Sequence, residues 1–133
     1  MSANPRLGYV KGERLPVACP VDASTTAIVV GDMLTLGTAG YVQQLAAGDI
    51  PYGVAMDPCA VPSADGALSV LVDISKEVIY RYVPDTGSVT AGLLFTTMDT
   101  GGPQSINIDA TTDNSVRCVG VDVAANTLLI KLA

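Results

Sequence analysis

Histidine and tryptophan are absent from this sequence, and phenylalanine occurs only once. Without histidine the chain cannot form a Ser-His-Asp triad or a Cys-His pair, and no side chain titrates near neutral pH in its unperturbed state. A cysteine-based zinc site would also lack its usual nitrogen ligand. We therefore expect no catalytic residue, no cofactor site and no metal site.

Charged residues are also scarce, at 15% of the chain, although mean hydropathy is +0.42. Typical soluble domains have about 25% charged residues, so we expect part of the apolar surface to be covered by other subunits. The net charge of −6 repels phosphate backbones and disfavours nucleic-acid binding. Composition thus predicts a subunit of a protein assembly.

Only three cysteines are present, Cys19, Cys59 and Cys118, and none forms a Cys-x-x-Cys pair. An odd number of widely spaced cysteines predicts buried thiols in a reducing compartment. The N-terminal sequence MSANPRLGYVKGERLPVACPV lacks the continuous apolar segment of a signal peptide, and no run of about 18 apolar residues predicts a membrane span. We expect synthesis in a cytosol and no membrane partner.

Short β-type segments make up most of the chain. Runs rich in Val, Ile, Leu and Thr recur between clusters of Gly, Pro, Asp and Asn, and no long segment keeps a helical apolar stripe. This predicts an all-β fold, a small sandwich or barrel, with an extended N-terminal arm over residues 1–20 and a single β domain over residues 21–133. The predicted strands are Leu15–Val21, Ala27–Val30, Met33–Leu36, Tyr41–Gln44, Tyr52–Met56, Leu68–Ile74, Val78–Val83, Leu93–Thr97, Ser105–Ile108, Val116–Val123 and Thr127–Leu132.

The order of these segments is repeated along the chain, which predicts two similar β-units. Two such units could pack face to face or close a barrel. The alternative is a coincidence of β-type sequence, since the insertions between the segments differ in length. The matched segments are 30–36 with 91–97, 52–57 with 119–124, and 68–74 with 127–132.

The tripeptide Asp-Thr-Gly occurs at Asp85 and at Asp99, and it also begins the catalytic loop of aspartic proteases. Those enzymes need two carboxylates that face each other, whereas these two aspartates flank one predicted strand. A homodimer would need Asp99 alone, but Cys118-Val119-Gly120 follows too soon for the flap hairpin of such an enzyme. Asp and Gly are typical turn residues, so we predict two turns with a strand between them, and a dimeric protease using Asp99 is a remote alternative.

Residues 27–57, followed by residues 65–74, resemble the phage head decoration proteins, which are also called capsid cement proteins. Their pattern is a strand that leads into Gly-Asp, a polar turn, a Gly-Asp-x-Pro-x-Gly-Val-Ala phrase and a further apolar strand. The residues that fit it are Gly31-Asp32, Gly48-Asp49, Pro51, Gly53-Val54-Ala55 and Val70-Leu71-Val72.

The resemblance implies a structural virion protein without enzymatic activity, made in the host cytoplasm and bound to the outer surface of an expanded phage capsid. The implied partners are the major capsid protein and copies of the chain itself, as a homotrimer at three-fold or quasi-three-fold positions. Such a protein stabilises the capsid by bridging neighbouring capsid subunits. The structural alternative is a low-copy head-fibre adaptor or a receptor-binding β-module.

The N-terminal arm is the predicted capsid contact. Residues 1–20 carry a net charge of +2, which leaves −8 for residues 21–133. Basic side chains of the arm would pair with capsid carboxylates, and its apolar side chains would act as anchors. The alternative is a frayed terminus with solvated charges. The predicted contact residues are Arg6, Leu7, Tyr9, Lys11, Arg14 and Leu15.

Overall fold

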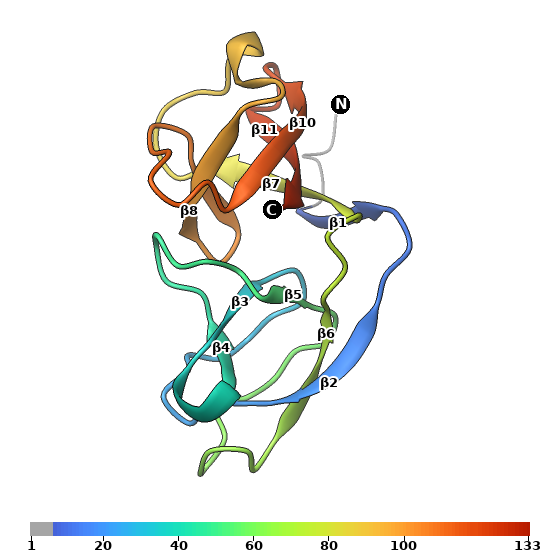
Figure 1. Cartoon of the computed structure of the whole chain (residues 1–133), viewed down its shortest axis with the longest axis vertical. Helices are drawn as coiled ribbons and strands as arrows, with labels where there is room; N and C mark the ends of the chain where they lie inside the picture. Colours follow the sequence, from blue (N-terminus) through green and yellow to red (C-terminus); the bar gives the residue numbers. More distant parts are fainter. Residues whose placement is uncertain (1–6) are drawn as a thin grey trace.

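The computed structural model describes residues 7–133, which form short strands together with two single-turn 3₁₀ helices, η1 (Thr38–Gly40) and η2 (Ala91–Leu93). The all-β prediction is confirmed. No helix within residues 7–133 is long and apolar enough to cross a membrane. Figure 1 shows two stacked groups of strands, which we call the first unit and the second unit.

The first unit contains five strands in the order β2-β6-β5-β3-β4, with antiparallel neighbours. Val21, directly after β2, forms a parallel bridge with Val42 at the start of β4. The sheet thereby closes on itself, which pairs its two edge strands. The strands of this unit are β2 (Pro16–Pro20), β3 (Met33–Leu36), β4 (Val42–Gln44), β5 (Gly53–Ala55) and β6 (Ser69–Asp73).

The second unit repeats this arrangement in the order β7-β11-β10-β8-β9, and β7 pairs with β9 in parallel to close the sheet. A further strand, β1 (Gly8–Lys11), pairs with the N-terminal part of β7. The strands of this unit are β7 (Ile79–Pro84), β8 (Thr97–Gly102), β9 (Ser105–Asn107), β10 (Val116–Asp122) and β11 (Thr127–Leu132).

The two units also share their strand register, so the prediction of two similar β-units is confirmed. The register aligns residues 30–36 with 94–100, three residues beyond the alignment that the sequence suggested, and it aligns residues 52–57 with 115–120, four residues before the suggested 119–124. The residue pairs that correspond are Cys19–Val70 with Tyr82–Leu128, Leu34–Gly53 with Met98–Val116, Ala55–Val72 with Cys118–Ile130, and Val21–Val42 with Pro84–Ile106.

A buried seam joins the two units. Met33, Leu45 and Val54 belong to the first unit, but they pack into the hydrophobic core of the second. The backbone N–H of Met33 donates to the carbonyl of Pro103 at 2.7 Å. The first unit also has a separate core of its own, built from smaller side chains such as Val72. The seam is therefore an apolar contact between the units, and Figure 1 shows β3 and β5 on the side of the first unit that faces the second.

Two buried tyrosines of β7 add polar contacts at the seam. The Tyr82 hydroxyl donates to the carbonyl of Gly31 at 2.8 Å, and the Tyr80 hydroxyl donates to the Asp73 carboxylate. Burial raises the pKa of both phenols, and the hydrogen bond to Asp73 raises that of Tyr80 further. Both tyrosines are thus neutral donors in the folded protein well above neutral pH.

Three predictions are wrong in detail. The strand predicted over Leu93–Thr97 is the end of η2 and a turn, and the strand that follows, β8, continues through the predicted turn at Gly101. A Cβ atom on Gly101 would lie 2.7 Å from the Asp85 side chain, so this glycine serves close packing within the strand. The strand predicted over Ala27–Val30 is reduced to one bridge at Ile28.

The arm predicted over residues 1–20 contributes two strands to the sheets, and residues 12–15 connect them. β1 pairs with β7, and β2 pairs with β6 over its whole length. A strand edge offers unpaired backbone donors and acceptors, and pairing with it satisfies the backbone of the N-terminal segment as well. The predicted boundary after residue 20 therefore falls inside the first unit.

Candidate binding surface

Three of the predicted arm residues meet at the seam. Leu7, Tyr9 and Arg14 line a pocket of about 320 Å³, whose other lining residues come from β1, from the loop before β3 and from β5. The Arg14 guanidinium lies 3.6 Å from the centroid of the Tyr9 ring, a cation–π contact. The Tyr9 hydroxyl donates to the carbonyl of Gly12 at 2.8 Å. This contact fixes the side chains of the β1–β2 connection against the body.

The other predicted arm residues lie elsewhere. Lys11 is exposed on β1, opposite Ile79, and Leu15 has an exposed side chain. The backbone N–H of Leu15 donates to the Asp73 carboxylate at 3.0 Å, which ties the chain to β6 at this point. Arg6 lies outside the described residues. Of the five predicted residues that the structure describes, Leu7, Tyr9 and Arg14 therefore line one pocket, and Lys11 and Leu15 do not.

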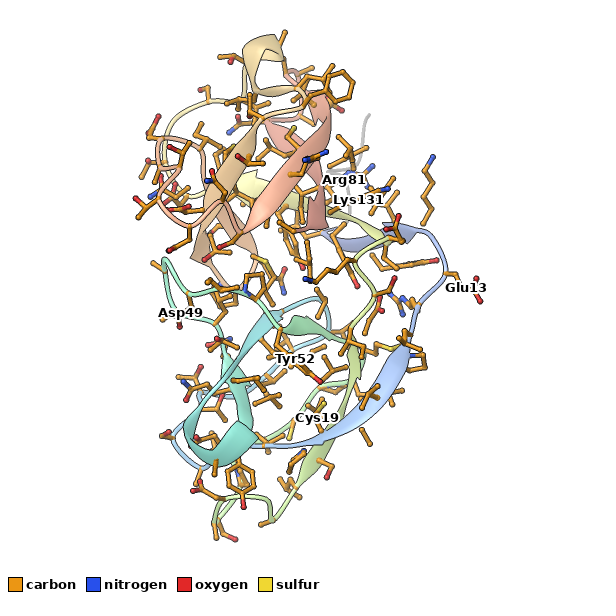
Figure 2. The ribbon with its side chains drawn as sticks, in the orientation of Figure 1. Glu13, Cys19, Asp49, Tyr52, Arg81 and Lys131 are labelled. Carbon is orange, nitrogen blue, oxygen red and sulfur yellow. The ribbon has the colours of Figure 1, made fainter. Side chains whose placement is uncertain are left out.

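The basic residues collect on the second unit. Residues 15–75 contain neither lysine nor arginine. Five basic side chains follow one side of β1, β7, β11 and β10 or the loop before β7, and we call this surface the basic face. Figure 2 shows two of them, Arg81 and Lys131, close together on the upper unit. The residues of the basic face are Lys11, Lys76, Arg81, Arg117 and Lys131.

Strand alternation explains why these side chains share a face. Tyr80, Leu128 and Ile130 point into the core and are fully buried. Their neighbours in sequence, including Arg81 and Lys131, therefore point outward. This periodicity places the cations on the outer side of a sheet whose inner side is apolar.

Two of these cations face each other directly. Arg117 of β10 pairs in register with Lys131 of β11, and like charges at opposed positions destabilise a sheet. Glu77 lies 3.5 Å from Lys131 and offsets part of this repulsion. Since both partners of that ion pair are solvent-accessible, its contribution is small.

The single phenylalanine lies beside these cations. Phe95 is 74% exposed, and its backbone φ is +67°. It lines a pocket of about 620 Å³ on the outer side of the second unit, which we call the Phe95 groove. The residues that line this groove are Lys76, Glu77, Phe95, Thr97, Arg117, Val119, Lys131, Leu132 and Ala133.

The first unit contains six acidic residues and neither lysine nor arginine, whereas residues 76–133 contain six acidic and four basic residues. Its acidic residues include the buried Asp32, which accepts hydrogen bonds from Gln104 and from Gln44, both at 2.9 Å. Asp49 and Tyr52 lie on this unit in Figure 2, away from the labelled basic residues. The molecule therefore presents an acidic unit and, on the other unit, a basic sheet face.

The two Asp-Thr-Gly sequences have different surroundings. The Asp99 carboxylate is buried and accepts backbone hydrogen bonds from Thr112, Asp113 and Asn114 at 2.8–3.1 Å. It therefore organises the loop before β10. Asp85 is exposed at the end of β7 and accepts the N–H of Thr86 at 2.8 Å, as expected for a turn.

Some of the residues that resemble decoration proteins lie at the seam, and others lie within the first unit. The carbonyl of Gly31 accepts the Tyr82 hydroxyl, and the carbonyl of Asp49 accepts the Thr100 hydroxyl at 2.7 Å. Gly53 packs so closely on β6 that a Cβ atom there would lie 2.5 Å from a Val72 methyl group. These residues join strands and units to each other.

Comparison of the chain with protein-family models, with curated proteins and with solved structures found no match. The resemblance therefore stays an expectation from residue patterns.

Of the basic face, only Lys11 was predicted from the sequence, because the prediction rested on the cluster of basic residues near the N-terminus. Lys76, Arg81, Arg117 and Lys131 are far apart in sequence, and β-pairing brings them together. A signal was available: residues 15–75 lack any basic residue, which confines the cations to the remaining strands.

Proposed function

We propose that this chain is a structural virion protein that binds the outer surface of an expanded phage capsid and stabilises it. The partners in this proposal are the major capsid protein and further copies of the chain, arranged as a homotrimer. The proposal rests on the residue pattern described above together with one structural observation, the concentration of cations on the basic face.

This concentration of cations supports binding through the basic face. Cations concentrated on a sheet face attract an acidic protein surface and orient the encounter. The apolar side chain of Phe95, among the same cations, supplies the kind of anchor that carries binding energy in protein interfaces. The basic face thus combines cations that attract an acidic partner with an apolar side chain that can pack against it.

Stabilisation of the capsid follows from mass action. A protein that binds assembled shells, and not separated subunits, stabilises the shell by RT ln(1 + [L]/Kd) per site. When one copy contacts two capsid subunits, removal of either subunit must break both contacts. Seam contacts such as the hydrogen bond from Tyr82 to Gly31 keep the two units of the bridging molecule together when a capsid subunit is pulled away.

The first test is binding to purified expanded shells by co-sedimentation. The double variant Lys76→Gln/Arg117→Gln removes two cations of the basic face, and we expect its affinity to fall at least tenfold. The wild-type affinity should also fall as salt is raised, because the contact is electrostatic.

The matched control is Asp57→Asn/Asp109→Asn, which removes two exposed charges away from the basic face. It should bind shells as tightly as the wild type. Equal binding by both double variants would show that the basic face is not the contact.

Copy number in purified particles separates the alternatives: about one copy per capsid subunit supports a decoration protein, and a few copies support a fibre adaptor.

A further inference from the structure

The Phe95 groove contains two features that cost the isolated chain stability. Phe95 follows η2 in the left-handed region, at φ +67°, where glycine or asparagine is the usual residue. A bulky side chain in this region is uncommon and strained. The Phe95 N–H donates to the carbonyl of Cys118 at 2.9 Å, which holds the strained residue beside β10.

The second feature is the cation pair. Arg117 and Lys131 stand opposite each other across β10 and β11, and both line the groove together with Lys76. Glu77 is the single acidic residue among the lining side chains. Carboxylates from a partner would therefore relieve a repulsion that the chain itself leaves mostly uncompensated.

We propose that the Phe95 groove binds an extended segment of the capsid subunit in which an apolar side chain is flanked by carboxylates two residues away on either side. This inference rests on the proposed function, because it names the partner chemistry of the basic face. In an extended segment, alternate side chains point the same way and are about 6.6 Å apart. The apolar side chain would contact Phe95, and one flanking carboxylate would lie beside Arg117 and Lys131, which stand directly opposite each other.

Charge complementarity selects this chemistry. The lining contains three cations and one carboxylate around Phe95, Val119 and Leu132. A basic segment would add to the existing repulsion, and an uncharged apolar segment would bury cations without partners, which is costly. An acidic segment with one apolar anchor satisfies both parts of the groove.

The key variant is Phe95→Gly, because glycine adopts a positive φ without strain. We expect this variant to fold, with an unfolding midpoint equal to or above that of the wild type, and to bind shells at least tenfold more weakly. Phe95→Ala, which keeps the strain, should lose the same affinity without the gain in stability. A merely structural role of Phe95 would instead lower the midpoint in both variants.

The matched control is Ile50→Gly. Ile50 is 63% exposed on the first unit, so the substitution also removes a large exposed apolar side chain. Its shell affinity should stay within twofold of the wild type. If Phe95→Gly also binds within twofold, the inference is overturned while the proposed function stands.

A peptide probe tests the groove without capsids. The blocked peptide acetyl-Asp-Ser-Leu-Ser-Asp-amide should shift the methyl resonances of Val119 and Leu132 in the wild type, and not in Phe95→Gly. The same peptide with lysine in place of aspartate should leave them unchanged. Shifts with the acidic peptide but no shell binding by the wild type would support the groove and refute the proposed function.

A second copy of the chain is the competing occupant, since the first unit is acidic. Sedimentation equilibrium distinguishes it. Self-association of the wild type that disappears in Phe95→Gly, with shell binding retained, would assign the groove to the second copy and overturn the inference.

Discussion

The two units of this molecule share a five-strand order and fill their interiors differently. Where the first unit has Cys19, Ala55 and Val72, the second has Tyr82, Cys118 and Ile130 at the corresponding positions. Backbone hydrogen bonds fix the pairing independently of side-chain identity, whereas packing only requires that each interior be filled. Similar topology can therefore persist when little sequence similarity is visible.

The comparison extends to the surface. The first unit has acidic residues and, from residue 15 to residue 75, no cation, while the second carries the basic face and Phe95. The interior of the second unit also continues across the seam to Met33 and Val54. One unit thus supplies the candidate contact, and the other is joined to it through a shared core.

The largest expected effect comes from the shared core. Ile130→Ala should lower the free energy of unfolding by about 2–5 kcal/mol, because a fully buried side chain leaves a cavity. Since the seam couples the units, both should unfold together. Thiol labelling against denaturant reports each unit separately, through Cys19 and Cys59 in the first and Cys118 in the second. Earlier labelling of Cys118 than of Cys19 would show that the units unfold independently.

Alkaline pH should have a smaller effect, through the tyrosines of the second unit. The pKa values of Tyr80 and Tyr82 are raised in the folded protein, mainly by burial, while the unfolded phenols have pKa values of about 10. The stability that the two neutral phenols contribute is fully present below about pH 10, and it is lost as the pH rises above that value because the unfolded phenols then ionise. The two together should cost about 2 kcal/mol of stability between about pH 10 and 11.

The double variant Tyr80→Phe/Tyr82→Phe provides the control for this pH dependence. It lacks the phenols, so its free energy of unfolding should fall less steeply above about pH 10. The first unit has Val17 and Cys19 at the corresponding positions, so it contributes no tyrosine to this effect. If the free energy of unfolding of the variant falls with pH as steeply as that of the wild type, the loss of stability at alkaline pH is due to other groups.

The sequence predicted the regular strands well and the irregular ones poorly. Met33–Leu36 and Thr127–Leu132 are strands with the predicted bounds, because apolar and β-branched residues predominate there and neither segment contains glycine or proline. β8 was missed because Thr97–Gly102 contains two glycines and an aspartate, which usually indicate a turn. Its strand conformation depends on tertiary contacts, such as Gly101 against Asp85.

The candidate site was less predictable than the fold. Tyr9, Lys11 and Arg14 were predicted as contacts, yet only Lys11 lies on the basic face. Assembly of that face depends on the pairing of β10 with β11 and of β11 with β7, which the sequence does not specify. The exposure of Phe95 likewise depends on the position of η2.

Hydrogen–deuterium exchange of the protein bound to expanded shells tests the division between the units most directly. The account predicts that binding slows exchange in residues 76–82 and 117–131, which carry the basic face, and leaves residues 41–75 of the first unit unchanged. Slower exchange confined to the first unit, or no change in either, would contradict it.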